Sequence, residues 1–255
     1  MEGIDREVLK DIPSHEIDEK KMPFTAHLAE LRMRLIWICL SLGICFAVVY
    51  PNSERLLLFL QRPLGQKLIM ISPTESFMVY LKLSFFGALI LSVPMILYQL
   101  WAFVAPGLYP SEKRLALPFV IFTTLCFALG AVFAYELALP IGLKFLLKFG
   151  GDLVTPMISV ANYVSFVGML LLAFGFVFEF PVLIVLFVKL GLVTSAFLRK
   201  NRKYVILGIF IIAAVLTPGP DVFSQFLMAL PLWFLYEISL LIAVFFERSK
   251  RKDEL

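Results

Sequence analysis

Long apolar runs with almost no charges recur along this chain and constrain its fold more than any other feature. Of its 255 residues, 60% are hydrophobic and 16% are charged, whereas soluble domains are about 45 to 50% apolar. The runs suit helices that cross a hydrocarbon core of about 30 Å. We therefore predict an all-α, polytopic membrane protein with six transmembrane helices, near residues 34–50, 76–99, 115–135, 161–188, 204–216 and 222–246.

The remaining segments predict a simple domain organisation. Residues 1–21 form a polar tail, residues 22–246 the transmembrane domain, and residues 247–255 a basic tail. No apolar stretch followed by a small-residue cleavage site precedes the first run, so we expect that run to be retained. The final letters KDEL match a luminal retention signal. Because they follow basic residues, which favour the cytoplasmic side, we interpret the match as chance.

Lysine and arginine predict the orientation in the membrane. Of the 23 basic residues, 17 fall in the two tails and in the loops 100–114 and 189–203. The opposite loops hold five, and Lys82 lies within a span. Basic residues stay on the cytoplasmic side. Both termini are therefore predicted to be cytoplasmic.

The predicted helices are unequal, and several contain proline. The 13 residues of 204–216 cover only about 20 Å. We expect the bilayer to be thinner there, or the end of this short helix to be covered by other segments. Pro94, Pro181 and Pro231 should bend their helices. Bent, unequal helices favour a concave, cup-like surface, although kinks can also simply improve packing.

Two loops on the predicted outer side are themselves apolar. Ser53–Leu60 and Leu137–Phe149 carry sparse charges, as in helices that lie at a membrane interface. Ordinary loop helices packed on the spans remain the alternative. Before the second span, the sequence Ser-Pro-Thr-Glu ending at Glu75 predicts a helix start, with an acid near the positive end of the helix dipole.

Glu179 is a carboxylate in the middle of an apolar run. A charge at the bilayer centre costs about 2.5 to 3.5 kcal/mol, so such a residue normally faces protein or water. It shares a helical stripe with Ser165, Gly168, Leu172 and Gly175. Small residues permit close helix approach or leave a hollow. We expect the stripe to avoid lipid and Glu179 to contact something that enters from the side; a protonated acid bonded to a neighbouring span is the alternative.

We expect structural roles for the other polar residues within the predicted spans. Glu237 in the last span is expected to make a structural hydrogen bond, with Gln225 nearer the outer face. Lys82 could extend its charge to the outer surface. The odd number of cysteines argues against a disulfide framework, and we interpret all three as small buried hydrophobic residues: Cys39, Cys45 and Cys126.

Two acids occur on the side where basic residues dominate. Glu30 lies four residues before Arg34, so one interpretation is a pair along a helix. Glu112 follows Ser111, so one interpretation is a capped first-turn acid. Carboxylates also bind guanidinium groups through paired, directional hydrogen bonds. A ligand that carries paired arginines would suit both acids.

Enzymatic patterns are missing from the sequence. His15-Glu16 is not part of an H-E-x-x-H zinc motif, and the chain has neither a G-x-S-x-G elbow nor a Walker phosphate loop. Two histidines outside the predicted spans are too few for a metal or triad site within the membrane. We expect no catalysis, cofactor, metal or nucleic-acid partner.

Six sequence elements in order resemble the TatC family, the multi-span receptor subunits of the twin-arginine protein translocase. The elements are HLAELRMRL (27–35), SPTESF (72–77), PMILYQLWAFVAPGLYPSEKR (94–114), AFGFVFEFP (173–181), LTPGPDVFSQ (216–225) and LPLWFLYE (230–237).

This resemblance implies a receptor in the prokaryotic inner membrane. Such proteins bind signal peptides with consecutive arginines, self-associate, assemble with single-span TatA and TatB type subunits and use the proton gradient. By motif position, Glu30 and Glu112 correspond to the family's twin-arginine site, Arg32 and Arg114 to its basic positions, Glu179 to its membrane acid, and Asp221 to the acid of its last outer loop. Ser111 and the additional Gly219 depart from the family pattern.

The resulting hypothesis is recognition without chemistry. Glu30 and Glu112 would hold two arginines of a signal peptide, while Phe103, Leu108 and Tyr109 contact its apolar residues. A proton-coupled solute transporter that uses Glu179 and Glu237 is the main alternative. A passive assembly scaffold, which would need neither Glu30 nor Glu112, is a third.

Overall fold

The computed structural model of the protein describes residues 24–104, 116–148, 157–189, 191, 193–216 and 222–253. Within these ranges the secondary structure is helical apart from one isolated bridge between Ile69 and Ser159. The predicted all-α class is therefore confirmed. The elements are α1 (Phe24–Val49), η1 (Tyr50–Asn52), α2 (Ser53–Gln61), η2 (Arg62–Leu64), α3 (Glu75–Val104), α4 (Ala116–Phe133), η5 (Ala134–Ala138), α5 (Leu139–Lys148), α6 (Val160–Val177), α7 (Phe180–Lys189), α8 (Ser195–Lys200), α9 (Arg202–Leu216) and α10 (Val222–Asp253).

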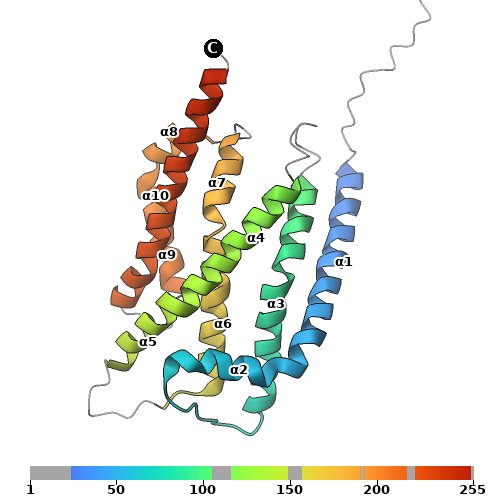
Figure 1. Ribbon diagram of the computed structural model, residues 1–255, viewed down its shortest axis with the longest axis vertical. Coiled ribbons are helices and arrows are strands. Elements are labelled where there is room, and N and C mark those ends of the chain that lie inside the picture. Colours follow the sequence, from blue (N-terminus) through green and yellow to red (C-terminus); the bar gives the residue numbers. More distant parts are fainter. Residues whose placement is uncertain are drawn as a thin grey trace, which may run out of the picture.

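The long helices stand side by side, and α2 lies across one end of them (Figure 1). The start of α1 and the end of α10 lie at the opposite end of the bundle, which we call the termini end. The other end is called the α2 end. The end of α3 and the start of α4 also lie at the termini end. Glu30 lies near the start of α1, whereas Glu112 falls outside the described residues.

Five helical segments among the described residues are long and apolar enough to cross a membrane. The sixth helix, α9, has 15 residues and spans only about 22 Å. This helix corresponds to the predicted short span, and thinning of the bilayer beside it stays a prediction. The five are Leu28–Leu64, Glu75–Phe103, Pro118–Lys148, Val160–Val188 and Met228–Phe245.

Helix limits differ from the hydrophobic limits in two places. Helix α1 begins at Phe24, because the charged segment before the apolar run is also helical. Helix α10 continues through the basic segment to Asp253. Hydropathy marks where a helix can enter lipid, whereas the helix itself ends only where capping or chain direction requires it.

The segment Leu137–Phe149 is not a separate interfacial helix. In Figure 1, α4, η5 and α5 form one continuous tilted rod. The element η5 is a single π-helical turn within this rod. Both expectations for this segment, an interfacial helix and a loop helix packed on the spans, are therefore wrong, because its described part up to Lys148 continues α4. Ser53–Leu60, in contrast, does form a separate helix, α2, that crosses the bundle.

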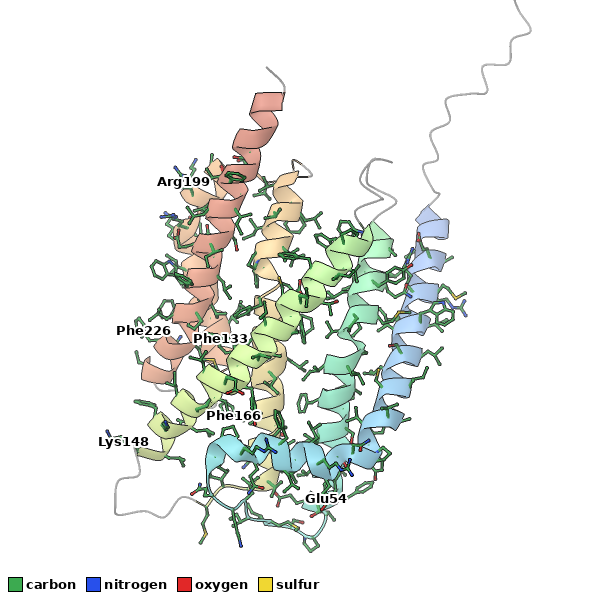
Figure 2. All side chains as sticks on the ribbon, viewed as in Figure 1. Glu54, Phe133, Lys148, Phe166, Arg199 and Phe226 are labelled. Carbon is green, nitrogen blue, oxygen red and sulfur yellow. The ribbon has the colours of Figure 1, made fainter. Side chains whose placement is uncertain are left out.

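Helix α6 lies in the main core, and α1 lies at the edge of the bundle. Val164, Val167 and Phe174 of α6 are fully or almost fully buried. Along α1, large apolar side chains such as Trp37 and Leu40 are about half exposed, and side chains on its outer edge project away from the other helices (Figure 2). Helix α1 packs against α3, so its remaining surface is available to lipid or to another helix.

Candidate functional site

At the termini end, Glu30 of α1 already binds a guanidinium group. Arg34 donates from Nε to Glu30 Oε1 over 3.1 Å and also from Nη2 to the same oxygen. The predicted pair four residues apart along a helix is thus confirmed. The side chains of Glu30 and Arg34 are only 23% and 21% exposed, so solvent screens this ion pair less than a pair at an open surface.

Gln99 of α3 is a third member of this cluster, which the sequence did not reveal. Arg34 donates from Nη1 to Gln99 Oε1 over 3.3 Å. Gln99 is 6% exposed, and its Nε2 lies 4.0 Å from the sulfur of Met95. The fork of one arginine therefore joins a carboxylate on α1 to a buried amide on α3. Residues 34 and 99 are too far apart in sequence for any local pattern to have indicated this contact.

The surroundings of this cluster include two further predicted site residues. Arg32 is exposed. Phe103 is half-buried and lies four residues after Gln99, on the same face of α3. Trp101 is 7% exposed and stacks on Phe119 of α4 with ring centroids 4.1 Å apart. This stack fixes the end of α3 against α4 beside the cluster.

Five predicted site residues lie outside the described residues. The separation of Glu30 from Glu112 is therefore not determined, and the twin-acid site stays a prediction. The five are Leu108, Tyr109, Glu112, Arg114 and Asp221, and the atypical Ser111 and Gly219 lie in the same undescribed segments.

Glu179 lies at a break between α6 and α7 and is covered by protein. Its side chain is 5% exposed, and its Oε1 has no hydrogen-bond partner among the described residues. Pro181 explains the break, since it cannot donate to the carbonyl of Val177. The backbone N–H of Glu179 instead bonds to Phe176 O at 3.1 Å, and the helix resumes when Leu183 donates to Glu179 O at 3.0 Å.

The glycines on the predicted stripe allow close helix approach. A Cβ on Gly168 would lie 2.3 Å from the ring of Phe86 on α3, and a Cβ on Gly175 would lie 2.5 Å from the ring of Phe127 on α4. Both glycines are buried. The expectation that this stripe avoids lipid is confirmed. Glu179 is held within tight packing, so a partner could reach it only if these helices moved apart.

Glu75 joins several segments at the α2 end, a structural role that the sequence did not indicate. Its Oε1 accepts hydrogen bonds from Ser159 Oγ at 2.5 Å and from the Ala161 N–H at 3.0 Å. Its Oε2 accepts from the N–H groups of Ile71 and Ser72. Glu75 begins α3, and Ser159 is the N-cap of α6. One buried carboxylate therefore joins the starts of two membrane-spanning helices.

Further hydrogen bonds attach α2 to the bundle. Tyr163 of α6 donates to Leu60 O over 2.6 Å, and Tyr135 of η5 donates to Phe59 O over 2.7 Å. Lys82 does not simply extend toward the surface, because it donates to Ser165 Oγ over 3.2 Å. These bonds connect α2 and α3 with segments that are far away in sequence.

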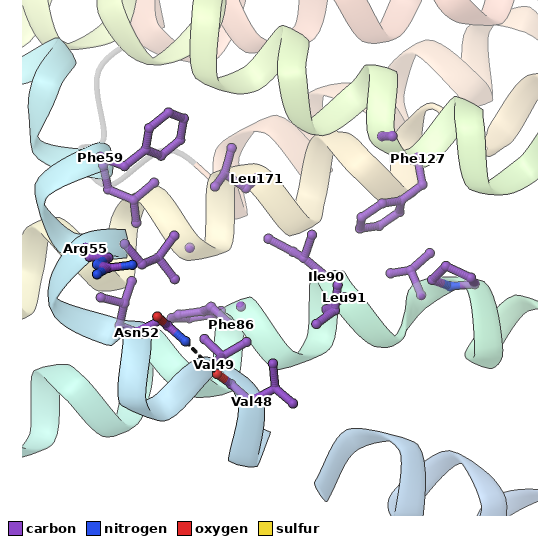
Figure 3. Close-up of a pocket in the computed structure, with 18 of the residues that line it drawn as sticks. Val48, Val49, Asn52, Arg55, Phe59, Phe86, Ile90, Leu91, Phe127 and Leu171 are labelled. Atoms are coloured by element: carbon purple, nitrogen blue, oxygen red, sulfur yellow. Dashed lines mark hydrogen bonds between the residues drawn. The ribbon is translucent and has the colours of Figure 1, made fainter. Parts of the chain in front are cut away.

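A groove of about 660 Å³ opens between α1, α2, α3, α4 and α6. Its walls are almost entirely apolar, with Phe86 and Ile90 from α3 facing Phe127 and Leu171 from α4 and α6 (Figure 3). Two polar side chains, Asn52 of η1 and Arg55 of α2, line the α2 end of the groove. The groove provides the predicted concave surface. Glu179 is not among its lining residues in the described part of the chain.

Glu237 has a structural partner at the termini end. Arg202 of α9 donates from Nη2 to Glu237 Oε2 of α10 over 2.7 Å. Gln225 links the same two helices by donating to Phe210 O over 2.9 Å. The expected structural bond of Glu237 is thereby confirmed, and a proton relay through Glu237 would have to break this ion pair.

The three cysteines are free thiols, as the odd count predicts. Cys45 and Cys126 are partly buried, but Cys39 is exposed on α1. The expectation that all three are buried is therefore wrong for Cys39, because α1 packs on one side only and turns the rest of its surface outward.

Comparison with known proteins decides the family. A model of the family described as "Sec-independent protein translocase protein (TatC)" matches residues 26–231. The chain belongs to the TatC family. The TatC protein of Desulforapulum autotrophicum is 44% identical over 243 residues, covering 93% of this chain and 90% of that relative. The TatC protein of Carboxydothermus hydrogenoformans is 43% identical over 241 residues, covering 93% of this chain and 99% of that relative.

Solved TatC structures share the fold. A crystal structure of the twin-arginine translocase receptor TatC in DDM is 41% identical and superimposes with a TM-score of 0.79, covering 85% of this chain and 99% of that one. This TatC family member is therefore a multi-pass membrane protein of a protein translocase, with the all-α fold predicted from its apolar runs. The resemblance read from six sequence elements is confirmed.

Proposed function

We propose that this protein is the signal-peptide receptor of a twin-arginine translocation system. It binds folded cargo proteins through signal peptides that carry two consecutive arginines. The observation that carries the proposal is the Glu30 carboxylate, which holds a guanidinium group at the termini end of the bundle. Because Arg34 is a guanidinium donor from this chain, the same carboxylate has the chemistry and position to accept one from a peptide.

The second arginine is assigned to Glu112 in the loop between α3 and α4. That loop follows Phe103, and Phe103, Leu108 and Tyr109 would contact the apolar residues that flank the arginines. Arg32 and Arg114 would repel peptides with other basic patterns. The family motif supports these roles, since each residue occupies the matching position.

The apolar segment of the signal peptide would continue into the groove between α1, α3, α4 and α6. The groove is open and almost entirely apolar, and burial of apolar area gives about 25 cal/mol per Å². Gly168 and Gly175, which share a helical stripe with Glu179, pack closely against neighbouring helices. Glu179 would become available to a partner helix only after the peptide or a partner separates these helices.

Topology and partners complete the proposal. The termini end faces the cytoplasm, since basic residues gather in the tails and in the loops at that end, and the membrane is the prokaryotic inner membrane. The exposed apolar surfaces of α1 and α10 would bind single-span subunits of the TatA and TatB type and further copies of this chain. The transmembrane proton gradient would supply the energy, and Asp221 would act in the last outer loop.

Site-specific crosslinking tests the two acids. A twin-arginine signal peptide with a photoreactive residue beside the arginines is presented to the purified protein in lipid. Glu112→Gln should lower the crosslink yield about tenfold, since a charge-assisted pair contributes about 1.5 kcal/mol or more. The control is Glu54→Gln, an exposed acid of α2 at the far end. Unchanged crosslinking by the Glu112 variant would remove this residue from the site.

A further inference from the structure

Arg34 fills the position on Glu30 that a peptide arginine would need. Both Nε and Nη2 of Arg34 point at Glu30 Oε1. An arriving guanidinium of the signal peptide therefore meets an occupied carboxylate. It must displace Arg34 or share Glu30 with it.

We infer that Arg34 is an internal competitor that lowers the affinity of the receptor for every peptide whose basic side chain must displace it from Glu30. This inference rests on the function proposed above and adds a residue to it. The free receptor keeps Glu30 paired with Arg34, and a peptide binds productively only when its own guanidinium makes better contacts than Arg34 does. A lysine carries a compact ammonium group without the parallel N–H donors of a guanidinium group. It therefore reproduces the two contacts of Arg34 with Glu30 poorly.

Gln99 makes the exchange possible without leaving Arg34 unpartnered. Its Oε1 already accepts from Arg34 Nη1 at 3.3 Å, and its position is fixed because it is 6% exposed on α3. When Glu30 turns to a peptide arginine, Arg34 can keep this second acceptor. A buried guanidinium without any acceptor would carry a large desolvation penalty.

The arrangement lowers affinity and leaves the ratio between peptides unchanged. Every basic peptide must overcome the same Arg34 contact, so the penalty falls on twin-arginine and twin-lysine peptides alike. Only the ligand with the matching guanidinium group recovers the lost contacts in full. A weakly bound lysine peptide therefore stays unbound at concentrations at which a twin-arginine peptide still binds.

The test measures binding of four peptides to the full-length protein in lipid nanodiscs. The peptides carry Arg-Arg, Arg-Lys, Lys-Arg and Lys-Lys at the paired position. Arg34→Gln should bind all four peptides more tightly, each by about the same factor of three, so that the ratios between their affinities are unchanged. Arg199→Gln is the charge-matched control, since Arg199 is exposed on α8 at the same end, and it should leave all four affinities unchanged.

A second variant tests the role of Gln99. Gln99→Leu should weaken Arg-Arg binding several-fold in the presence of Arg34, because the displaced Arg34 then lacks its acceptor. In the Arg34→Gln background the same substitution should have no effect on binding. Arg34→Lys should give affinities between those of wild type and Arg34→Gln, since it restores the charge without the paired guanidinium contacts.

The outcomes separate this inference from the proposed function. If Arg34→Gln weakens all four peptides to the same extent, Arg34 merely orients Glu30 and the inference is overturned. If it changes nothing while wild type prefers Arg-Arg and Glu30→Gln abolishes that preference, the inference fails and the receptor function stands. If wild type shows no preference and Glu30→Gln has no effect, the proposed function fails, and the inference with it.

Discussion

The α2 end of the bundle and the contact between α1 and α3 at the termini end are built differently. At the α2 end, a buried carboxylate and two tyrosines bind segments that are distant in sequence through short hydrogen bonds to backbone and hydroxyl groups. At the termini end, Glu247 joins α10 to α8 in a similar way, since it accepts from the Ser195 N–H at 2.8 Å, whereas the hydrogen bond from α1 to α3 is made by the long side chain of Arg34. Half of the most apolar stretch of Val160–Val188 is buried, but none of that of Leu28–Leu64. The comparison indicates a fixed frame around α6 and an adaptable binding surface beside α1.

This division has a physical reason. Backbone groups at helix ends must find partners in a region where water is scarce, and Glu75 and the tyrosines supply them. An arginine held by a carboxylate and an amide can exchange partners without breaking backbone structure. The proposed receptor function would need such exchange at the binding surface, to admit different signal peptides, and rigidity elsewhere.

The largest expected effect comes from Glu75→Gln. An amide offers one acceptor oxygen where Glu75 receives bonds from Ser159, Ala161, Ile71 and Ser72. The free energy of unfolding should fall by about 3 kcal/mol. Thermal unfolding in detergent measures the loss. The matched control Glu54→Gln removes an exposed charge from α2 and should stay within about 0.5 kcal/mol of wild type; equal effects of both variants would contradict a special role for Glu75.

Gly130→Ala tests the tight core between the two ends. A Cβ at this position would lie 2.4 Å from Phe174 O and 2.9 Å from Phe174 C. Because a backbone carbonyl cannot turn away as a side chain can, α4 and α6 must separate, at a cost of about 2 kcal/mol.

The matched control for this core test is Gly43→Ala in α1. No atom lies within 4 Å of its added Cβ, so the substitution should be neutral or stabilise the helix by up to about 1 kcal/mol. The same unfolding assay compares the two variants. A stable Gly130→Ala protein would show that the contact between α4 and α6 is looser than described.

Tyr163→Phe should have the smallest of these effects on stability. It removes the hydroxyl that bonds Leu60 O and leaves that carbonyl without this donor, which costs about 1 kcal/mol. Hydrogen–deuterium exchange should rise in α2 and remain unchanged in α1. Tyr204→Phe is the control, since Tyr204 is 62% exposed. Faster exchange in α1 as well would mean that the two ends are coupled rather than independent.

The sequence predicted the features that depend on composition and on local spacing. Apolar runs indicated the helices, and the spacing of Glu30 and Arg34 indicated their pair. The capping sequence Ser-Pro-Thr-Glu indicated that Glu75 lies in the first turn of a helix. Each of these features is local, so it is visible in a single stretch of sequence.

Contacts between distant segments could not be predicted in this way. Ser159 is the partner of Glu75 but lies 84 residues later, and Gln99 lies 65 residues after Arg34. Which side chains meet depends on how the helices pack, and a single sequence gives no sign of it. The continuous rod from α4 to Lys148 was missed because the sparse charges of its last part suggested an interface.

A double-mutant cycle between Glu30 and the arginines of a signal peptide tests the central claim most directly. Affinities are measured for wild type and Glu30→Gln, each with an Arg-Arg peptide and with peptides in which one arginine is replaced by lysine. We expect a coupling free energy above about 1 kcal/mol between Glu30 and one of the two arginines, and none between Glu54 and either arginine. Zero coupling at Glu30 in a receptor that still binds the peptide would contradict the account.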